Sequence, residues 1–145
     1  MGMCVMKNMA HKVLGNWIIA AHGEVAPLDD EFREALDLFK SIDYGRIRML
    51  IFSKGGAPTA MQRKQLNDAI QGKVLTTAVV TDVYFIRGIV TAITWYNQRI
   101  RAFPSSALDE AFHYLEIPSD QYEQFRREAI KLQAEVAVRS ARRRY

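Results

Sequence analysis

Residues 47–71 read IRMLIFSKGGAPTAMQRKQLNDAIQ, and this stretch decides the fold. It opens with a short apolar run at 47–52, which suits the centre of a parallel sheet whose two faces are both covered. Gly55 and Gly56 follow, and we expect one of them to take the positive φ that a tight turn requires. Thr59 and Gln62 then form a T-x-x-Q capping box. The stretch therefore predicts a buried strand, a glycine turn and the start of a helix.

The segments on either side extend this unit into an alternating pattern of strands and helices. A Leu14-Gly15-Asn16 connection between two strand-like runs indicates a hairpin at the beginning. Alternation after a hairpin is typical of an α/β fold, here a mixed and mostly parallel sheet with covering helices. We expect a domain at 1–117 and a C-terminal helical extension with a basic tail at 118–145. The predicted strands are 3–13, 16–25, 47–52, 74–80 and 99–103, and the longer predicted helices are 29–42, 59–72, 83–96 and 119–140.

Composition and charge narrow the function classes. The formal net charge is +4, and four arginines near the end, at 139 and 142–144, account for all of it. Nucleic acid is therefore not an expected partner, because phosphate contacts need a broader basic face. Cys4 is the only cysteine, and no apolar run reaches the ~18 residues of a spanning helix. The first residues do not read as a signal peptide, so we expect a cytoplasmic protein with no membrane span.

The order of elements resembles a known family. The segments that carry the resemblance are NWIIAAHGEV, the amphipathic stretch at 29–42, MLIFSKGGAPTAMQRKQLNDAI and AVVTDVYFIRGIVTAITWYNQRIRAFPSSALDEAFHYL. Over residues 5–117 they resemble the STAS fold of bacterial anti-sigma factor antagonists, and more closely the SpoIIAA-like (STAS/SEC14-type) proteins. The resemblance implies a bacterial module that acts by binding partner proteins. Antagonist domains carry a phosphorylatable serine in an Asp-Ser-Ser-Gly motif, whereas this chain has Gly-Gly-Ala-Pro-Thr-Ala at that place.

The glycine turn is one candidate site, because ligands of open α/β sheets gather at the carboxyl ends of the strands. Free backbone N–H groups and a helix N-terminus favour an anion there. The loop lacks the Gly-Lys-Ser/Thr ending of a P-loop, and a structural turn with a capped helix explains the same residues. The candidate anion or phospho-acceptor residues are Ser53, Lys54, Gly55, Gly56 and Thr59.

A second candidate site lies on the predicted helix at 83–96. This segment is apolar nearly all round, so we expect it to be buried or to contact a partner. The core of the domain and a partner or apolar-ligand surface are both consistent with its composition, although tryptophan, tyrosine and arginine are enriched at binding hot spots. The residues of this candidate surface are Tyr84, Phe85, Arg87, Trp95, Tyr96 and Arg99.

The final helix carries an apolar seam formed by Tyr122, Phe125, Leu132 and Val136. An exposed stripe of this kind makes a poor solvent face, so it needs a covering surface. The helix can fold back on its own sheet, or it can pair with the same helix of a second chain in a homodimer. We expect a homodimer, with the helix packed at least partly on its own sheet.

No nucleophile, base and orienting residue converge in the sequence, so we do not expect an enzyme. His11, His22 and His113 lack the spacing of metal ligands, and we expect neither a metal nor another cofactor. The function predicted from the sequence is a non-catalytic bacterial signalling or scaffold module that acts by protein–protein interaction. The alternative is a carrier of a small apolar molecule or lipid, which would need a cavity beneath the helix at 83–96.

Overall fold

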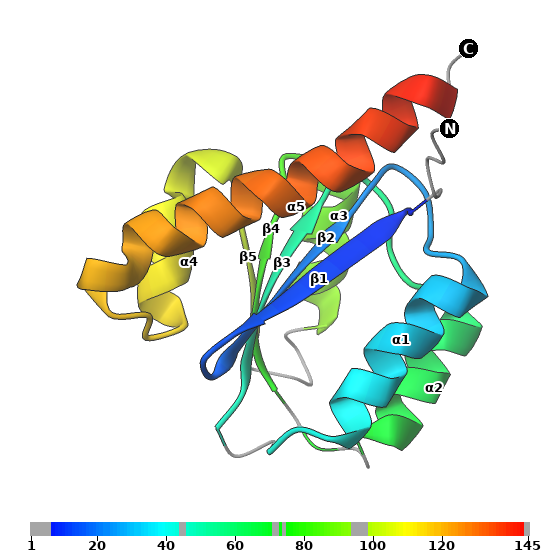
Figure 1. Ribbon diagram of the computed structural model, residues 1–145, viewed down its shortest axis with the longest axis horizontal. Coiled ribbons are helices and arrows are strands. Elements are labelled where there is room, and N and C mark those ends of the chain that lie inside the picture. Colours follow the sequence, from blue (N-terminus) through cyan, green and yellow to red (C-terminus); the bar gives the residue numbers. More distant parts are fainter. Residues whose placement is uncertain (1–6, 44–45, 71–72, 74, 94–98, 144–145) are drawn as a thin grey trace.

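The computed structural model describes residues 7–43, 46–70, 73, 75–93 and 99–143, and its elements follow the predicted order (Figure 1). The strands are β1 (Met9–Leu14), β2 (Trp17–His22), β3 (Arg48–Ser53), β4 (Thr76–Val80) and β5 (Ile100–Phe103). The α-helices are α1 (Asp29–Lys40), α2 (Ala60–Ala69), α3 (Tyr84–Ile93), α4 (Leu108–Tyr114) and α5 (Tyr122–Arg143). Short 3-10 turns at Ser105–Ala107 and Ser119–Gln121 precede α4 and α5.

The protein is an α/β protein built on one five-stranded mixed sheet, as the sequence predicts. The strands lie in the order β1-β2-β3-β4-β5, so each is hydrogen-bonded to its neighbours in sequence. β1 pairs antiparallel with β2 through a hairpin, and β2 to β5 are all parallel. Gly15 takes a φ of 58° in the hairpin turn, a conformation that glycine adopts without strain.

Helices α1, α2 and α3 cover one face of the sheet. A parallel connection between neighbouring strands is right-handed, and three such connections that step in the same direction place their helices on the same side. The aliphatic side chains of β2 and β3 on this face, Ile18, Ala20 and Met49, pack with Phe32 and Phe39 of α1. Val79 of β4 packs with Ile86 and Val90 of α3.

Helices α4 and α5 cover the opposite face, where the alternate strand residues point. Ile19, Leu50 and Val80 form its centre, with Phe112 of α4 and Phe125 of α5 packed on them. Figure 1 shows α5 lying diagonally across this face, and its contacts are with β1 and β2, whereas α4 contacts β4 and β5. The two helices therefore divide between them the face that the connecting helices leave uncovered.

An aromatic cluster joins the start of α5 to the first residue of β2. The Trp17 indole N–H donates a 2.9 Å hydrogen bond to the carbonyl of Leu115, which satisfies the polar atom of a half-buried ring. The same ring meets Phe125 edge-on, with ring centroids 5.6 Å apart. Phe125 in turn lies 6.1 Å from Phe112, which contacts Tyr122 at 5.0 Å. These contacts fix the start of α5 against β2 and α4.

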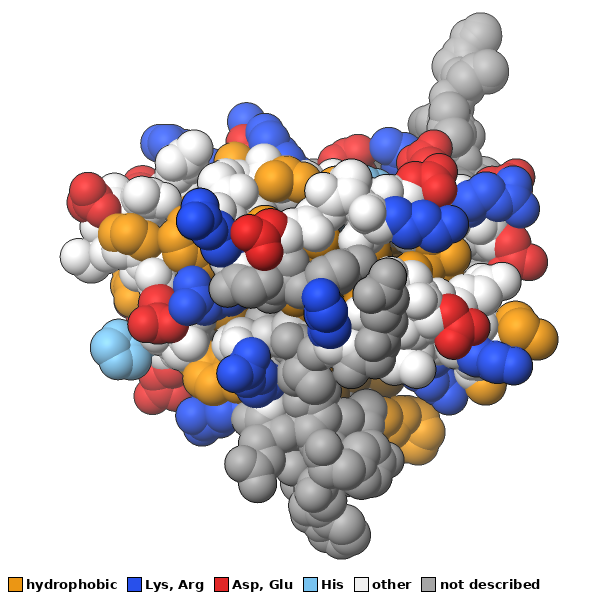
Figure 2. All heavy atoms as spheres, turned by 90° about the horizontal axis from the view of Figure 1, so that it is seen from below, with side chains coloured by type: hydrophobic (Ala, Val, Ile, Leu, Met, Phe, Trp, Pro, Cys, Tyr) orange, Lys and Arg blue, Asp and Glu red, His pale blue; other side chains and the backbone are white. Residues whose placement is uncertain are grey.

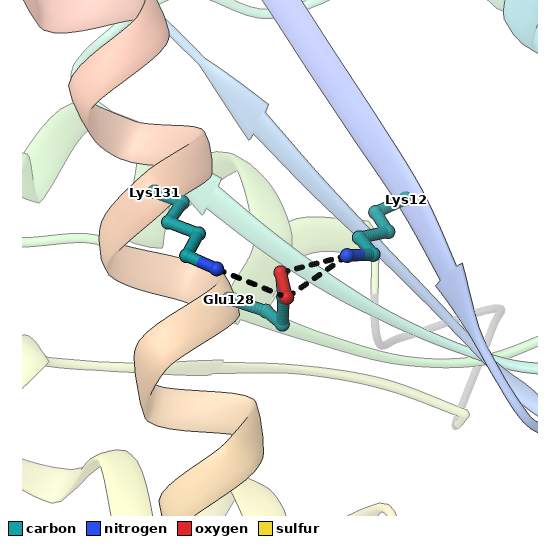
Figure 3. Close-up of polar contacts among 3 residues, drawn as sticks. All are labelled: Lys12, Glu128 and Lys131. Atoms are coloured by element: carbon teal, nitrogen blue, oxygen red, sulfur yellow. Dashed lines mark hydrogen bonds and ion pairs between the residues drawn. The ribbon is translucent and has the colours of Figure 1, made fainter.

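A polar contact secures the middle of α5 to β1 (Figure 3). The Lys12 ammonium donates to both carboxylate oxygens of Glu128, at 2.9 and 3.0 Å, and Lys131 lies 3.7 Å from the same carboxylate. The hydrogen bond from Lys12 is the largest cause that lowers the pKa of the Glu128 carboxyl. The pair bridges residues 116 positions apart in the sequence.

The seam of α5 is covered by its own chain. Phe125, Leu132 and Val136 are at most 5% exposed within the core of the α4–α5 face, and Tyr122 packs against the edge of that core. The fold-back alternative is therefore the one observed, and the interpretation of these four residues as a dimer seam is wrong. Phe125, Ala129, Leu132 and Val136 of α5 share one hydrophobic core with residues of the segment 1–117, and the boundary at 117 stays a prediction.

The predicted strand, glycine turn and capped helix form within residues 47–70. β3 is the central strand, and Leu50 is completely buried between the two helical layers. Gly55 has a φ of 122°, which confirms the expectation that one of the two glycines takes positive φ. Thr59 caps α2: its hydroxyl accepts from the Gln62 N–H at 3.2 Å, and the Gln62 side chain accepts from the Thr59 N–H at 2.9 Å.

Gly56 is required because a side chain would not fit, and not because of its φ angle. A Cβ atom placed there would lie 2.2 Å from the carbonyl oxygen of Val25 and 2.8 Å from that of Gly23. Both are backbone atoms of the segment after β2, and the Gly56 N–H donates to the Gly23 carbonyl at 2.9 Å. The turn after β3 is thus packed directly on the turn after β2, and only glycine fits between them.

We predict that Gly56→Ala lowers the free energy of unfolding by at least ~2 kcal/mol, because two backbone segments must move apart. The matched control is Gly88→Ala in α3, where a Cβ would meet nothing within 4 Å. This control should raise the free energy of unfolding by up to ~1 kcal/mol, since alanine is the better helix former. Urea denaturation of both variants measures the difference. Equal stability of the two variants would contradict the close packing of the turns.

Candidate functional site

The glycine turn uses its N–H groups internally. The Lys54 N–H donates to the His22 carbonyl at 3.2 Å, the Gly55 N–H to the Ser53 hydroxyl at 3.1 Å, and the Gly56 N–H to the Gly23 carbonyl. The Ser53 hydroxyl itself donates to the Gly56 carbonyl at 2.8 Å. These three amides are the ones that an anion cradle in the loop would need, so the geometry favours a structural turn.

Gln62 connects this turn to the next layer. It is 1% exposed, and its amide nitrogen donates to the Pro27 carbonyl at 2.9 Å and to the Asp29 carboxylate at 3.1 Å. Gln62, the second member of the capping box of α2, therefore also holds the segment at the start of α1. Thr59 is exposed with its hydroxyl engaged in the cap, and its role as a phospho-acceptor stays a prediction.

A cleft of about 360 Å³ lies at the carboxyl ends of β3 and β4, on the side of α4 and α5. Several of its polar groups are hydrogen-bonded to one another or to backbone carbonyls. The Thr81 hydroxyl donates to the Ser53 carbonyl at 2.8 Å, and Asp82 accepts from the hydroxyl and the N–H of Ser105 at 2.6 and 2.9 Å. The two bonds from Ser105 lower the pKa of the Asp82 carboxyl. These bonds tie the end of β3 and the residues after β4 and β5 together, and Thr81, Asp82 and Ser105 are engaged within the protein.

An apolar cavity of about 170 Å³ lies on the other face, beneath α3. Its floor is the sheet, through Ala20 and Ile51, and its walls come from all three helices of that face, through Phe39, Leu66 and Ile86. The loop between β3 and α2 contributes Gly56, Ala57 and Pro58 to one side. The cavity therefore lies between the parallel strands, the helices that connect them and the glycine turn. Its lining is almost entirely apolar.

His22 is the exception in this lining. It ends β2, is 5% exposed, and faces the cavity from the sheet. Within the described part of the chain, its Nδ1 is buried and has no hydrogen-bond partner. Burial alone lowers the pKa of the imidazole from 6.5 to about 4, so the ring is neutral at pH 7. A buried polar atom without a partner is uncommon in folded proteins and marks His22 as a functional candidate.

The outer side of α3 carries exposed aromatic residues. Tyr84 is 81% exposed and Phe85 75%, and Ile89, one turn further on, is 41% exposed. The Arg87 guanidinium lies over the Tyr84 ring, 4.4 Å from its centroid. Ile86 and Val90 of the same helix are buried against the sheet. One side of α3 is therefore buried, as one of the two expectations has it. The other side is exposed, and its contact with a partner stays a prediction.

The predicted aromatic–basic group does not assemble as one surface. Tyr84, Phe85 and Arg87 follow the carboxyl end of β4, whereas Arg99 precedes β5 at the opposite edge of the parallel sheet, where its carbonyl accepts from the Thr77 N–H. The grouping of Arg99 with Tyr84 and Phe85 is therefore wrong. Trp95 and Tyr96 lie outside the described residues.

Sequence reasoning missed the importance of His22 and placed the site at the turn beside it. The signal that could have found it is a histidine at the end of an apolar strand, in a position that alternation assigns to the same face as Ile18 and Ala20. A polar side chain in a core position needs a hydrogen-bond partner, and the sequence pattern does not identify one for His22.

Charges on the face in Figure 2 do not form a basic patch: lysine and arginine side chains lie scattered among acidic ones. Within residues 7–43, 46–70, 73, 75–93 and 99–143 there is no group of three or more acidic, histidine or cysteine side chains that could hold a metal ion. None of the helices in those same ranges combines the length and the apolar character needed to cross a membrane.

The pKa of His22 predicts a pH dependence of stability. Between about pH 6.5 and pH 4 the unfolded chain binds a proton at His22 that the folded chain does not bind. The free energy of unfolding should therefore fall as the pH is lowered through this window, by up to ~3 kcal/mol. The other ionisable side chain that lines the cavity is Arg63.

Urea denaturation at about pH 7 and about pH 4.5 measures the effect. His22→Leu should lose this part of the pH dependence, and His113→Asn, a change at an exposed histidine, should retain it. The same pH dependence in the wild-type protein and in His22→Leu would show that His22 is not the group responsible.

Comparison with known proteins finds no match among family models, curated proteins or solved structures. The resemblance to STAS and SpoIIAA-like proteins therefore stays a prediction from the order of elements.

Proposed function

We propose that the protein is a non-catalytic bacterial signalling or scaffold module that binds another protein through the outer side of α3. The observation that carries the proposal is the exposure of Tyr84 and Phe85, at 81% and 75%. Two large aromatic side chains on adjacent positions of one helix, with Ile89 beside them, form an apolar surface on a helix already anchored to the sheet by Ile86 and Val90.

The residue types on this surface support a role in binding a partner protein. Tyrosine and arginine are enriched among the residues that dominate binding energy, and Arg87 already stacks on Tyr84 at 4.4 Å. An arranged pair of this kind loses less side-chain entropy on association than two free side chains. The proposal includes a cytoplasmic location, which rests on the sequence alone. A homodimer also stays a prediction, and it would need a surface other than the covered seam of α5.

The double variant Tyr84→Ser, Phe85→Ser tests the proposal by affinity capture from an extract of the cells that make the protein. Both side chains are exposed, so we expect stability to change by no more than ~0.5 kcal/mol per substitution. The variant should lose proteins that the wild type captures. Ile130→Ser is the matched control, because Ile130 is 67% exposed on α5, on the other side of the sheet. Capture of the same proteins by all three would refute an α3 surface.

The cavity supports a second candidate function, a carrier of a small apolar molecule. Its volume of about 170 Å³ and its lining of aliphatic and aromatic side chains suit a ligand of one ring, not a lipid with long chains. The cavity lies beneath the third helix, which is where the carrier alternative requires it. Ile89 links the two candidate sites, because it lines the cavity and is also partly exposed.

Native mass spectrometry of the purified protein tests the carrier function. We expect a fraction of the protein to retain a bound molecule of low mass. Ala57→Leu, which adds volume to the lining of the cavity at a half-buried position, should reduce that fraction. A wild-type protein that is free of bound molecules and takes up none from an extract of its cells would contradict the carrier function.

A further inference from the structure

We propose that the cavity beneath α3 binds a small, uncharged cyclic molecule that carries one hydroxyl group, and that His22 forms a hydrogen bond with this hydroxyl. The inference rests on the carrier function and names the class of its ligand. It is carried by three observations: the size of the cavity, its apolar lining, and a buried polar atom in that lining, Nδ1 of His22, that has no hydrogen-bond partner among the described residues.

The size selects a ligand of about one ring. An engineered apolar cavity of about 150 Å³ in another protein binds benzene, and this cavity measures about 170 Å³. The sheet presents Ala20 and Ile51 to the ligand, and the helices present Phe39, Leu66 and Ile86. These five side chains provide dispersion contacts to a ring and carry no polar group of their own.

Two other polar side chains line the cavity, and both are engaged. The Ser53 hydroxyl donates to the Gly56 carbonyl at 2.8 Å and accepts from the Gly55 N–H at 3.1 Å. Arg63 is exposed, and its Nη1 donates to the Pro58 carbonyl at 2.8 Å. The buried Nδ1 of His22 has no such partner among the described residues. A ligand that supplies one recovers the free energy that an unsatisfied buried atom costs.

The chemistry of a neutral imidazole specifies the matching group. One ring nitrogen carries a proton and donates, and the other accepts. A hydroxyl group both donates and accepts, so it satisfies Nδ1 in either tautomer. A carboxylate or an ammonium group would have to lose its water shell against a lining that is mostly carbon. A phenol or a small cyclic alcohol therefore fits the site, and its charged analogues do not.

The test uses p-cresol and toluene, two probes of nearly the same shape that differ by one hydroxyl group. Their affinities for the full-length protein are measured by isothermal titration calorimetry, in the wild type and in His22→Leu. We expect the ratio of p-cresol affinity to toluene affinity to fall about tenfold in His22→Leu, because the hydroxyl then enters the cavity unpaired. Ala57→Leu should weaken the binding of both probes and so assign them to this cavity.

A second measurement does not depend on the folding of a variant. In the wild-type protein, the NMR signals of the His22 ring should shift with p-cresol more than with toluene at equal occupancy. A ratio that is unchanged in a folded His22→Leu protein, or equal shifts with the two probes, would overturn the role of His22 while leaving the carrier function intact. Binding of neither probe to the wild type, or binding that Ala57→Leu leaves unchanged, would overturn the site itself.

Discussion

The handedness of the strand connections is the constraint on which the rest of this structure depends. Four parallel strands in sequential order place α1, α2 and α3 on one face, since each right-handed connection steps the same way. The other face then has no connecting helix to cover it, although Ile19, Leu50 and Val80 are apolar. Helices α4 and α5 come after the last strand and supply that cover. Two sets of contacts hold these helices on the sheet: those of the Trp17 ring and the Lys12–Glu128 pair.

Much of the fold could be predicted from local chemistry. The hairpin at Gly15, the central strand β3, the positive φ of Gly55 and the capping box of Thr59 and Gln62 all follow from short-range steric and hydrogen-bonding rules, and the structure confirms them. What the sequence left open was which surface α5 covers. Its seam is equally suited to a sheet and to a second helix, and the choice depends on how much of the sheet the other helices leave bare.

The candidate site was harder to predict, for a different physical reason. A cavity is a shortfall in packing among residues from five or more elements, and no period in the sequence reports it. The glycine turn looked like an anion site because its composition supplies N–H groups, but the direction of those groups is set by the turn after β2. A lone histidine in a sequence has many possible roles, so His22 did not stand out. It became a candidate only once the structure showed the apolar side chains that surround it. Likewise α3 looked uniformly apolar, whereas Tyr84 and Ile86 face opposite environments.

The contact between α5 and the hairpin has a consequence for synthesis on the ribosome. Lys12 and Glu128 are 116 positions apart, and Lys7 pairs with Glu135 at 3.4 Å, so the segment around β1 and helix α5 complete one layer together. While translation proceeds, the segments that form β1 to β5 emerge before their second cover exists. The apolar side chains of Ala10, Ile19 and Leu50 stay open to water and to other nascent chains until α5 has been synthesised. Completion of this layer therefore waits for the synthesis of α5 and requires a closure of 116 positions along the chain.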